Sequence, residues 1–173
     1  MVRAMVVYES MFGHTEEVAH AIAASLPSDL VDVLEVGAAP VVIASDVELL
    51  VVGGPTHAFS MSRPETRADA QRQSGRPNVS ERFGVREWLD LVDIDPVVQT
   101  ASFDTHVEHP KMLRHIGSAA AAISRTLDDV GLRACSEPEH FWVKATLGPL
   151  ADGQLDRARA WGAGLRPVAL AST

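Results

Sequence analysis

Two short runs of apolar residues constrain the fold of this chain most strongly. Val2–Tyr8 and Leu49–Val52 contain almost no polar residue, which is typical of strands buried on both faces of a parallel sheet. Val97–Phe103 and Phe141–Ala145 are weaker examples of the same pattern, and Leu30–Val36 alternates with acidic residues like an edge strand. The sequence therefore predicts five strands.

Segments with helical periodicity separate these strands. Apolar residues recur every three or four positions in Thr15–Leu26, Val85–Val92, Ile116–Val130 and Leu155–Leu165. Neighbouring parallel strands need a crossover connection, and a helix that covers one face of the sheet supplies it. We therefore predict an α/β fold: a doubly wound five-stranded parallel sheet with helices on both faces, formed by residues 1–173 as a single domain.

Composition and charge limit the function. The chain has 173 residues, 46% of them hydrophobic, and a formal net charge of −8. This charge disfavours nonspecific binding to nucleic acid or an anionic membrane, and it would let an acidic face dock a basic partner. Apolar runs fall far short of the roughly 20 residues of a membrane span, Met1–Tyr8 lacks a signal-peptide pattern, and Cys135 is the single cysteine. We expect a cytoplasmic protein without an internal disulfide.

One segment interrupts the alternation of strands and helices. Residues 62–82, here called the polar insertion, are rich in Arg, Gln and Ser and contain five arginines: Arg63, Arg67, Arg72, Arg76 and Arg82. We interpret this segment as a long excursion after the third strand, at the edge where open α/β sheets bind ligands. Its arginines would suit the phosphates of a nucleotide or an interface between copies of the chain.

The first strand runs into a turn that suits a phosphate group. Tyr8–Glu16 contains a hydroxyl at Ser10, a glycine at Gly13 and a hydroxyl at Thr15, directly before a predicted helix. A helix N-terminus presents unpaired backbone N–H groups and a partial positive charge to an anion. Because the turn holds no Lys or Arg, it fits a bound monophosphate better than phosphoryl transfer. The plainer alternative is that Thr15 only caps the helix.

Two further strand ends would lie beside this turn. Gly53–Met61 follows the third strand, and Phe103–His106 ends the fourth. The carboxyl ends of neighbouring parallel strands share one edge of the sheet, so the three segments are expected to form one crevice. Pro55–Met61 contains no glycine, and a positive φ there should therefore be costly.

Missing residues argue against several other functions. A receiver domain needs an acidic pair after its first strand and an Asp at the end of its third, where this chain has Gly53 and Gly54. Cys135 has no Arg at the spacing of a low-molecular-weight phosphatase, and neither glycine-rich nucleotide motif occurs. His106, His109 and His115 do not follow a recognised zinc spacing, so we predict no metal site and no catalytic side chain.

Three motifs together resemble the flavodoxin-like flavoproteins. They are Ser10-x-Phe12-Gly13-His14-Thr15, Gly53-Gly54-Pro55-Thr56 and Arg159-Ala160-Trp161-Gly162, in an order and spacing that cover nearly the whole chain. The Ser-x-aromatic-Gly-His turn looks most like that of the flavodoxin-like quinone reductases. The resemblance implies strand order 2-1-3-4-5 and a non-covalent FMN. Its implied binding residues are Ser10, Met11, Phe12, Gly13, His14 and Thr15 around the phosphate, and Pro55, Thr56, His57, Ala58, Phe59, Phe103, Asp104, Thr105 and His106 around the ring system.

Three functions follow as alternatives from the resemblance. The first is an FMN-binding protein of electron transfer that exchanges electrons with a redox partner protein. The second is an FMN-dependent oxidoreductase that uses NAD(P)H and a small acceptor such as a quinone. Copies of the chain could then form a homo-oligomer. The third is an interaction or regulatory module that has the fold without flavin.

Overall fold

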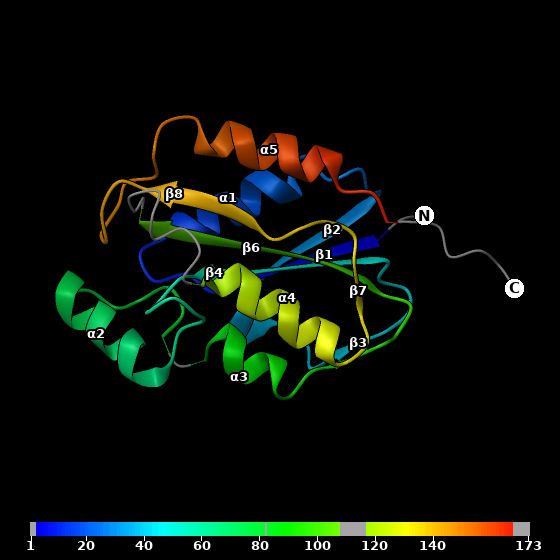
Figure 1. The fold of residues 1–173 in the computed structure, drawn as a ribbon, viewed down its shortest axis with the longest axis horizontal. Helices are drawn as coiled ribbons and strands as arrows, with labels where there is room; N and C mark the ends of the chain where they lie inside the picture. Colours follow the sequence, from blue (N-terminus) through cyan, green and yellow to red (C-terminus); the bar gives the residue numbers. More distant parts are fainter. Residues whose placement is uncertain (1–2, 82, 108–116, 168–173) are drawn as a thin grey trace, which may run out of the picture.

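The computed structural model describes residues 3–81, 83–107 and 117–167. Its main sheet is built on five parallel strands: β1 (Arg3–Tyr8), β2 (Leu30–Glu35), β4 (Leu49–Pro55), β6 (Gln99–Val107) and β8 (Glu139–Val143). They lie in the order β2-β1-β4-β6-β8 (Figure 1), which is the predicted order 2-1-3-4-5. The predicted fold class is confirmed.

The structure also contains short strands that the sequence does not predict. β7 (Arg133–Ala134) pairs with the beginning of β6, while β3 (Val42–Ile43) and β5 (Asp93–Ile94) pair only with each other. Two residues are too few to show a periodicity, so such strands leave no signal in the sequence.

Strand β6 corrects one predicted boundary. It begins at Gln99 and continues to Val107, so Thr105 and His106 belong to the strand and not to a turn after it. Phe103 lies opposite Gly53 of β4, and a Cβ on Gly53 would stand 2.1 Å from the Phe103 ring. Gly53 therefore lets the Phe103 ring lie across β4 in the core, where it contacts Phe141 and Trp161 edge to face.

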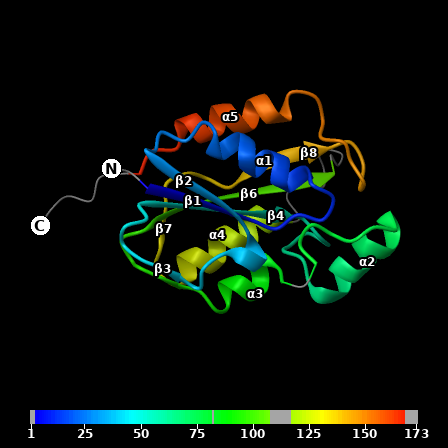
Figure 2. The ribbon, with the colours of Figure 1, turned by 180° about the vertical axis from the view of Figure 1, so that it is seen from behind.

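Helices cover both faces of the sheet (Figures 1 and 2). α1 (His14–Ala23) and α5 (Gln154–Gly164) pack side by side on one face. α3 (Val85–Leu89) and α4 (Ala119–Asp129) cover the other face. Each face of the sheet has its own apolar core cluster beneath its helices. A short 3₁₀ helix, η1 (Val36–Ala38), follows β2. The predicted helices are confirmed, with the predicted start of α4 at Ile116 outside the described residues.

The polar insertion contains a helix, which the sequence analysis did not predict. α2 (Pro64–Ser74) has a proline in its first turn and ends at Gly75, whose φ is 64°. It lies beyond the carboxyl ends of the strands (Figures 1 and 2). Its buried residues are Arg67 and Ala70, so it shows no apolar stripe, and the long excursion after the third strand contains a helix that no periodicity predicted.

Candidate functional site

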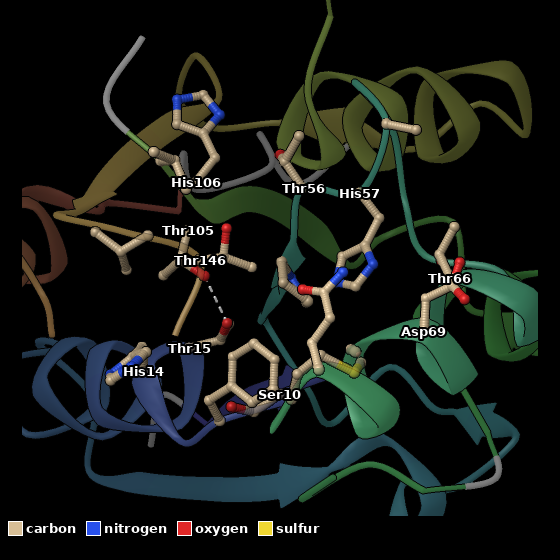
Figure 3. Close-up of a pocket in the computed structure, with 18 residues that line it drawn as sticks. Ser10, His14, Thr15, Thr56, His57, Thr66, Asp69, Thr105, His106 and Thr146 are labelled. Atoms are coloured by element: carbon tan, nitrogen blue, oxygen red, sulfur yellow. Dashed lines mark hydrogen bonds between the residues drawn. The ribbon is translucent and has the colours of Figure 1, made fainter. Parts of the chain in front are cut away.

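A pocket of about 380 Å³ opens at the carboxyl edge of the sheet. Its walls come from the turn after β1, the turn after β4, the ends of β6 and β8, and α2 (Figure 3). The predicted site residues that line it are Ser10, Met11, Phe12, His14, Thr15, Pro55, Thr56, His57, Ala58, Thr105 and His106. This volume lies in the range of small-molecule sites.

One wall of the pocket is the N-terminus of α1, which no side chain caps. Gly13 precedes the helix at a φ of 94°, and its backbone N–H donates to the Ser10 hydroxyl at 3.1 Å. The Thr15 hydroxyl bonds the Thr105 hydroxyl at 2.7 Å and does not turn back to the helix end (Figure 3). The plainer reading of Thr15 as a helix cap is therefore wrong, and the helix end faces the pocket without an acceptor of its own.

The end of the polar insertion holds this turn in place. Backbone N–H groups of Ser80 and Val79 donate to the carbonyls of Ser10 and Met11 at 2.7 and 3.0 Å. The Ser80 hydroxyl accepts from the Ser10 N–H and donates to Glu35 at the end of β2. The turn is thus rigid before any ligand arrives, which lowers the entropy cost of binding.

The turn after β4 is strained. Ala58 and Phe59 have φ values of 47° and 66°, and His57 and Ser60 exchange backbone hydrogen bonds at 2.8 and 3.0 Å around them. Two central residues with positive φ define the tight hairpin that usually takes Asn and Gly. A positive φ in this turn was expected to be costly, because a left-handed conformation costs an L-residue roughly 1–2 kcal/mol. Two residues of the turn adopt a positive φ despite that cost.

His57 lines the pocket at the start of that turn. Burial lowers the pKa of its imidazole, and the nearby Arg67 guanidinium lowers it further. His57 therefore presents a neutral ring that can donate at one nitrogen and accept at the other.

Four predicted site residues do not line the pocket. Gly13 shapes the turn through its φ, and Phe59 is 45% exposed. Phe103 is fully buried in the core and cannot face a ring in the pocket. Asp104 is also fully buried: its Oδ2 accepts from the Thr56 hydroxyl at 3.1 Å and from the Ala120 N–H at 2.9 Å.

α2 supplies a wall that the sequence analysis missed. Its pocket-lining residues are Thr66, Asp69, Ala70 and Gln73, which are spaced as one face of a helix. Figure 3 shows Thr66 and Asp69 on the side of His57 away from His14 and Thr15. These residues have helical spacing in the sequence. Because most of the segment is polar, no apolar periodicity distinguishes this face of the helix. Val107, Val143 and Thr146 also line the pocket and were missed.

A buried network anchors α2 to the sheet. Arg67 is 3% exposed, donates to the Ser62 hydroxyl at 2.9 Å and pairs with Glu87 at 3.0 Å. The Ser62 hydroxyl in turn donates to Glu9, whose other oxygen accepts the Val85 N–H at 2.8 Å. Burial raises the pKa of the Glu9 carboxyl against the lowering effect of these donors.

The structure places the described arginines of the polar insertion outside the pocket lining. Arg67 is buried, and Arg72 is an exposed partner of Asp69. Neither they nor Arg63 line the pocket, and Arg82 lies outside the described residues. Steering of nucleotide phosphates by this set stays a prediction.

The chain was compared with known proteins. No protein-family model and no curated protein sequence matches it. Solved structures match over nearly the full length. A flavodoxin from the domain Archaea gives a TM-score of 0.58 at 17% identity, covering 95% of this chain and 96% of that one. Flavodoxin 1 from Bacillus cereus gives 0.58 at 18%, covering 94% and 96%.

A WrbA-like protein from Agrobacterium tumefaciens, described as a flavodoxin, gives a TM-score of 0.56 at 16% identity, with 95% of both chains covered. At such identities the likeness is one of fold. The chain has the flavodoxin-like fold, as the strand order already indicated. Within the described part of the chain, no helix is long and apolar enough to cross a membrane.

Proposed function

We propose that this protein binds FMN in the pocket and acts in electron transfer. The observation that carries the proposal is the N-terminus of α1, which faces the pocket without a side-chain cap. Its N–H groups and the positive end of its dipole suit a phosphate monoester.

The rest of the pocket fits a flavin ring. Apolar side chains of Phe12, Pro55, Ala58, Val107 and Val143 line it alongside hydrogen-bonding groups. Ligand pockets combine an apolar lining with a few polar groups that fix orientation. His57, Thr66 and Gln73 provide such groups here. Bound FMN would supply electron transfer in steps of one or two electrons, while the protein would orient it and control access.

The α2 wall favours a small acceptor over a protein partner. A carrier protein must expose the edge of its flavin to another protein, whereas α2 stands across the pocket from α1. We therefore propose, as a second candidate, an FMN-dependent oxidoreductase that uses NAD(P)H and a small acceptor such as a quinone. In that role α2 would restrict the pocket to small planar molecules. We propose action in the cytoplasm for both candidates.

A binding titration with two ligands tests the proposal. Purified protein freed of bound flavin is titrated with FMN and, separately, with riboflavin, which lacks the phosphate, and flavin fluorescence is followed. A phosphate held at α1 predicts FMN affinity at least about 100-fold higher, since charge-assisted hydrogen bonds contribute about 1.5–3 kcal/mol each. Equal affinities would remove the phosphate site. Failure to bind either flavin would leave a flavin-free interaction module.

Stopped-flow reduction then separates the two candidates. An oxidoreductase loaded with FMN is bleached by NADH or NADPH alone and recovers its colour when a quinone is added. A carrier stays oxidised under the same conditions and is reduced only when a redox partner protein is present.

A further inference from the structure

We propose that Asp104, His106 and His140 form a binding site for a divalent transition-metal ion such as Zn²⁺. One oxygen of Asp104 and one ring nitrogen of each histidine lie within 4.8 Å of one another. The Nδ1 atoms of His140 and His106 are 3.0 and 3.8 Å from Asp104 Oδ1. Donor atoms bound about 2.0–2.2 Å from a zinc ion stand at similar separations, so small side-chain rotations would close the site.

The sheet itself brings the three side chains together. Asp104 and His106 are two residues apart on β6 and therefore point to the same face, and His140 lies opposite Asp104 on β8. In the sequence, His106 is grouped only with His109 and His115, and that spacing predicts no metal site. Those two residues lie outside the described part of the chain, and His140 comes from another strand.

Asp104 has the hydrogen bonding expected of a metal ligand. Its Oδ2 is held by the Thr56 hydroxyl and the Ala120 N–H, while Oδ1 is directed toward the histidines. Metal-binding carboxylates are usually oriented in this way by partners on their second oxygen. The Trp142 ring packs against His106 with ring centres 4.4 Å apart, which restricts that imidazole as well.

The donor set determines which ions fit. Two imidazoles and one carboxylate suit Zn²⁺, Fe²⁺, Co²⁺ or Ni²⁺, whereas Mg²⁺ and Ca²⁺ require mainly oxygen ligands. Three protein ligands leave at least one coordination position for water or a small anion. His140 is 36% exposed in its side chain, so an ion can enter from solvent. His106 also lines the pocket, so the proposed ion would lie at the pocket rim.

The test uses untagged full-length protein that has been treated with a chelator and contains no flavin. Zn²⁺ is titrated in competition with a chromophoric chelator, and Co²⁺ is added separately as a spectroscopic probe. We expect one ion per chain, a higher Tm with Zn²⁺, and d–d bands of Co²⁺ without a thiolate charge-transfer band, because Cys135 is not a ligand. Because no flavin is present, the result does not depend on the proposed FMN site.

Variants decide which residues bind the ion. His140→Ala and His106→Ala should each weaken Zn²⁺ binding at least about 100-fold, beyond the 10–100-fold typical of outer-sphere changes. His20→Ala, at an exposed position of α1, and the double variant His109→Ala/His115→Ala should bind like the wild type. Where an alanine variant fails to fold without metal, the corresponding glutamine variant replaces it. Absence of saturable binding, a thiolate–cobalt band, or unchanged binding in the His140 and His106 variants would overturn the proposal.

Discussion

Two helices begin at the same edge of the same sheet, and their N-termini are built in opposite ways. The first three N–H groups of α4 each have a side-chain acceptor: Ala119 donates to Thr56, Ala120 to Asp104 and Ala121 to Ser118, at 2.8, 2.9 and 3.1 Å. α1 begins at His14, and its N-cap residue, Gly13, provides no side-chain cap. Every helix leaves such N–H groups unpaired unless something caps them.

The difference indicates which helix end is available to a ligand. At α4 the buried Asp104 already occupies the helix end with the kind of group that the helix dipole favours. A bound anion would therefore gain no further stabilisation from that dipole. At α1 the nearby acids, Glu16 and Glu17, lie within the first turn, and the helix end itself faces the pocket. We therefore expect the α4 end to serve stability and the α1 end to serve binding. Each prediction below tests one side of this contrast.

The largest effect is expected from removing the cap of α4. Asp104→Ala leaves the Ala120 N–H, the Thr56 hydroxyl and His140 without their common acceptor at a fully buried position. Because buried unsatisfied groups are costly, we expect a loss of about 3 kcal/mol in the free energy of unfolding. Urea denaturation in the presence of a chelator measures it.

The control for this variant is Asp129→Ala, at the exposed last residue of the same helix. Removing an acid from a helix C-terminus should change stability by less than about 0.5 kcal/mol, with a slight gain. If Asp104→Ala were as stable as the wild type, the α4 end would not be held by this carboxylate.

The second effect concerns the open end of α1. Gly13→Asp and Gly13→Asn add side chains of equal size where a Cβ meets no atom within 4 Å, and both residue types tolerate the left-handed φ of 94° better than most. The Asp carboxylate places a negative charge at the helix end and repels a phosphate, whereas Asn is neutral. We expect FMN to bind Gly13→Asp at least about 10-fold more weakly than Gly13→Asn.

Fluorescence titration of the two Gly13 variants gives the ratio, and riboflavin is the internal control. Riboflavin has no phosphate, so it should bind both variants equally. If FMN also bound both equally, the α1 N-terminus would not hold the phosphate and the contrast between the two helices would have no functional meaning.

The third effect is smaller and returns to α4. Ser118→Ala removes the hydroxyl that accepts from the Ala121 N–H, and an N-cap serine is worth about 1 kcal/mol. FMN affinity should not change, because Ser118 does not line the pocket. Ser118→Thr keeps a hydroxyl and should recover most of the stability, as seen in the urea midpoint. A loss of FMN binding in Ser118→Ala would contradict the division of roles between the helices.

The sequence predicts those parts of the fold that depend on apolar patterns. The five long strands were predicted, because central strands buried on both faces read as continuous apolar runs. Their order was implied by the resemblance to the flavodoxin-like flavoproteins. α2 was not predicted, because its buried face consists of one alanine and one arginine, and the arginine pairs with Glu87. Such a contact depends on residues 20 positions apart and leaves no local periodicity.

The candidate site was also predicted only in part. The turn Ser10–Thr15 was identified because strand, glycine, hydroxyls and helix are contiguous in the sequence. Phe103 and Asp104 were assigned to the pocket by the family resemblance, with a strand expected to end at Phe103, whereas β6 continues to Val107. Within a strand, burial depends on what packs above each face, and here Phe103 meets a glycine of β4. That pairing became visible only in the structure.

The smallest effect tests whether the strain in the turn after β4 is local. Ala58 has a φ of 47°, a conformation that costs an alanine roughly 1–2 kcal/mol but costs glycine little. Glycine also gains about 0.4–1 kcal/mol of conformational freedom in the unfolded chain, so the net gain in the free energy of unfolding from Ala58→Gly should be about 0.5 kcal/mol.

The control is the same change at Ala68, exposed within α2. It should cost about 1 kcal/mol, because a helical φ gives glycine no advantage. Opposite signs in the two urea midpoints would confirm that Ala58 is strained in the folded protein, and equal losses would show that the turn relaxes without cost. FMN titration of Ala58→Gly completes the comparison: weaker binding with higher stability would mean that the strained turn is held in shape for the ligand.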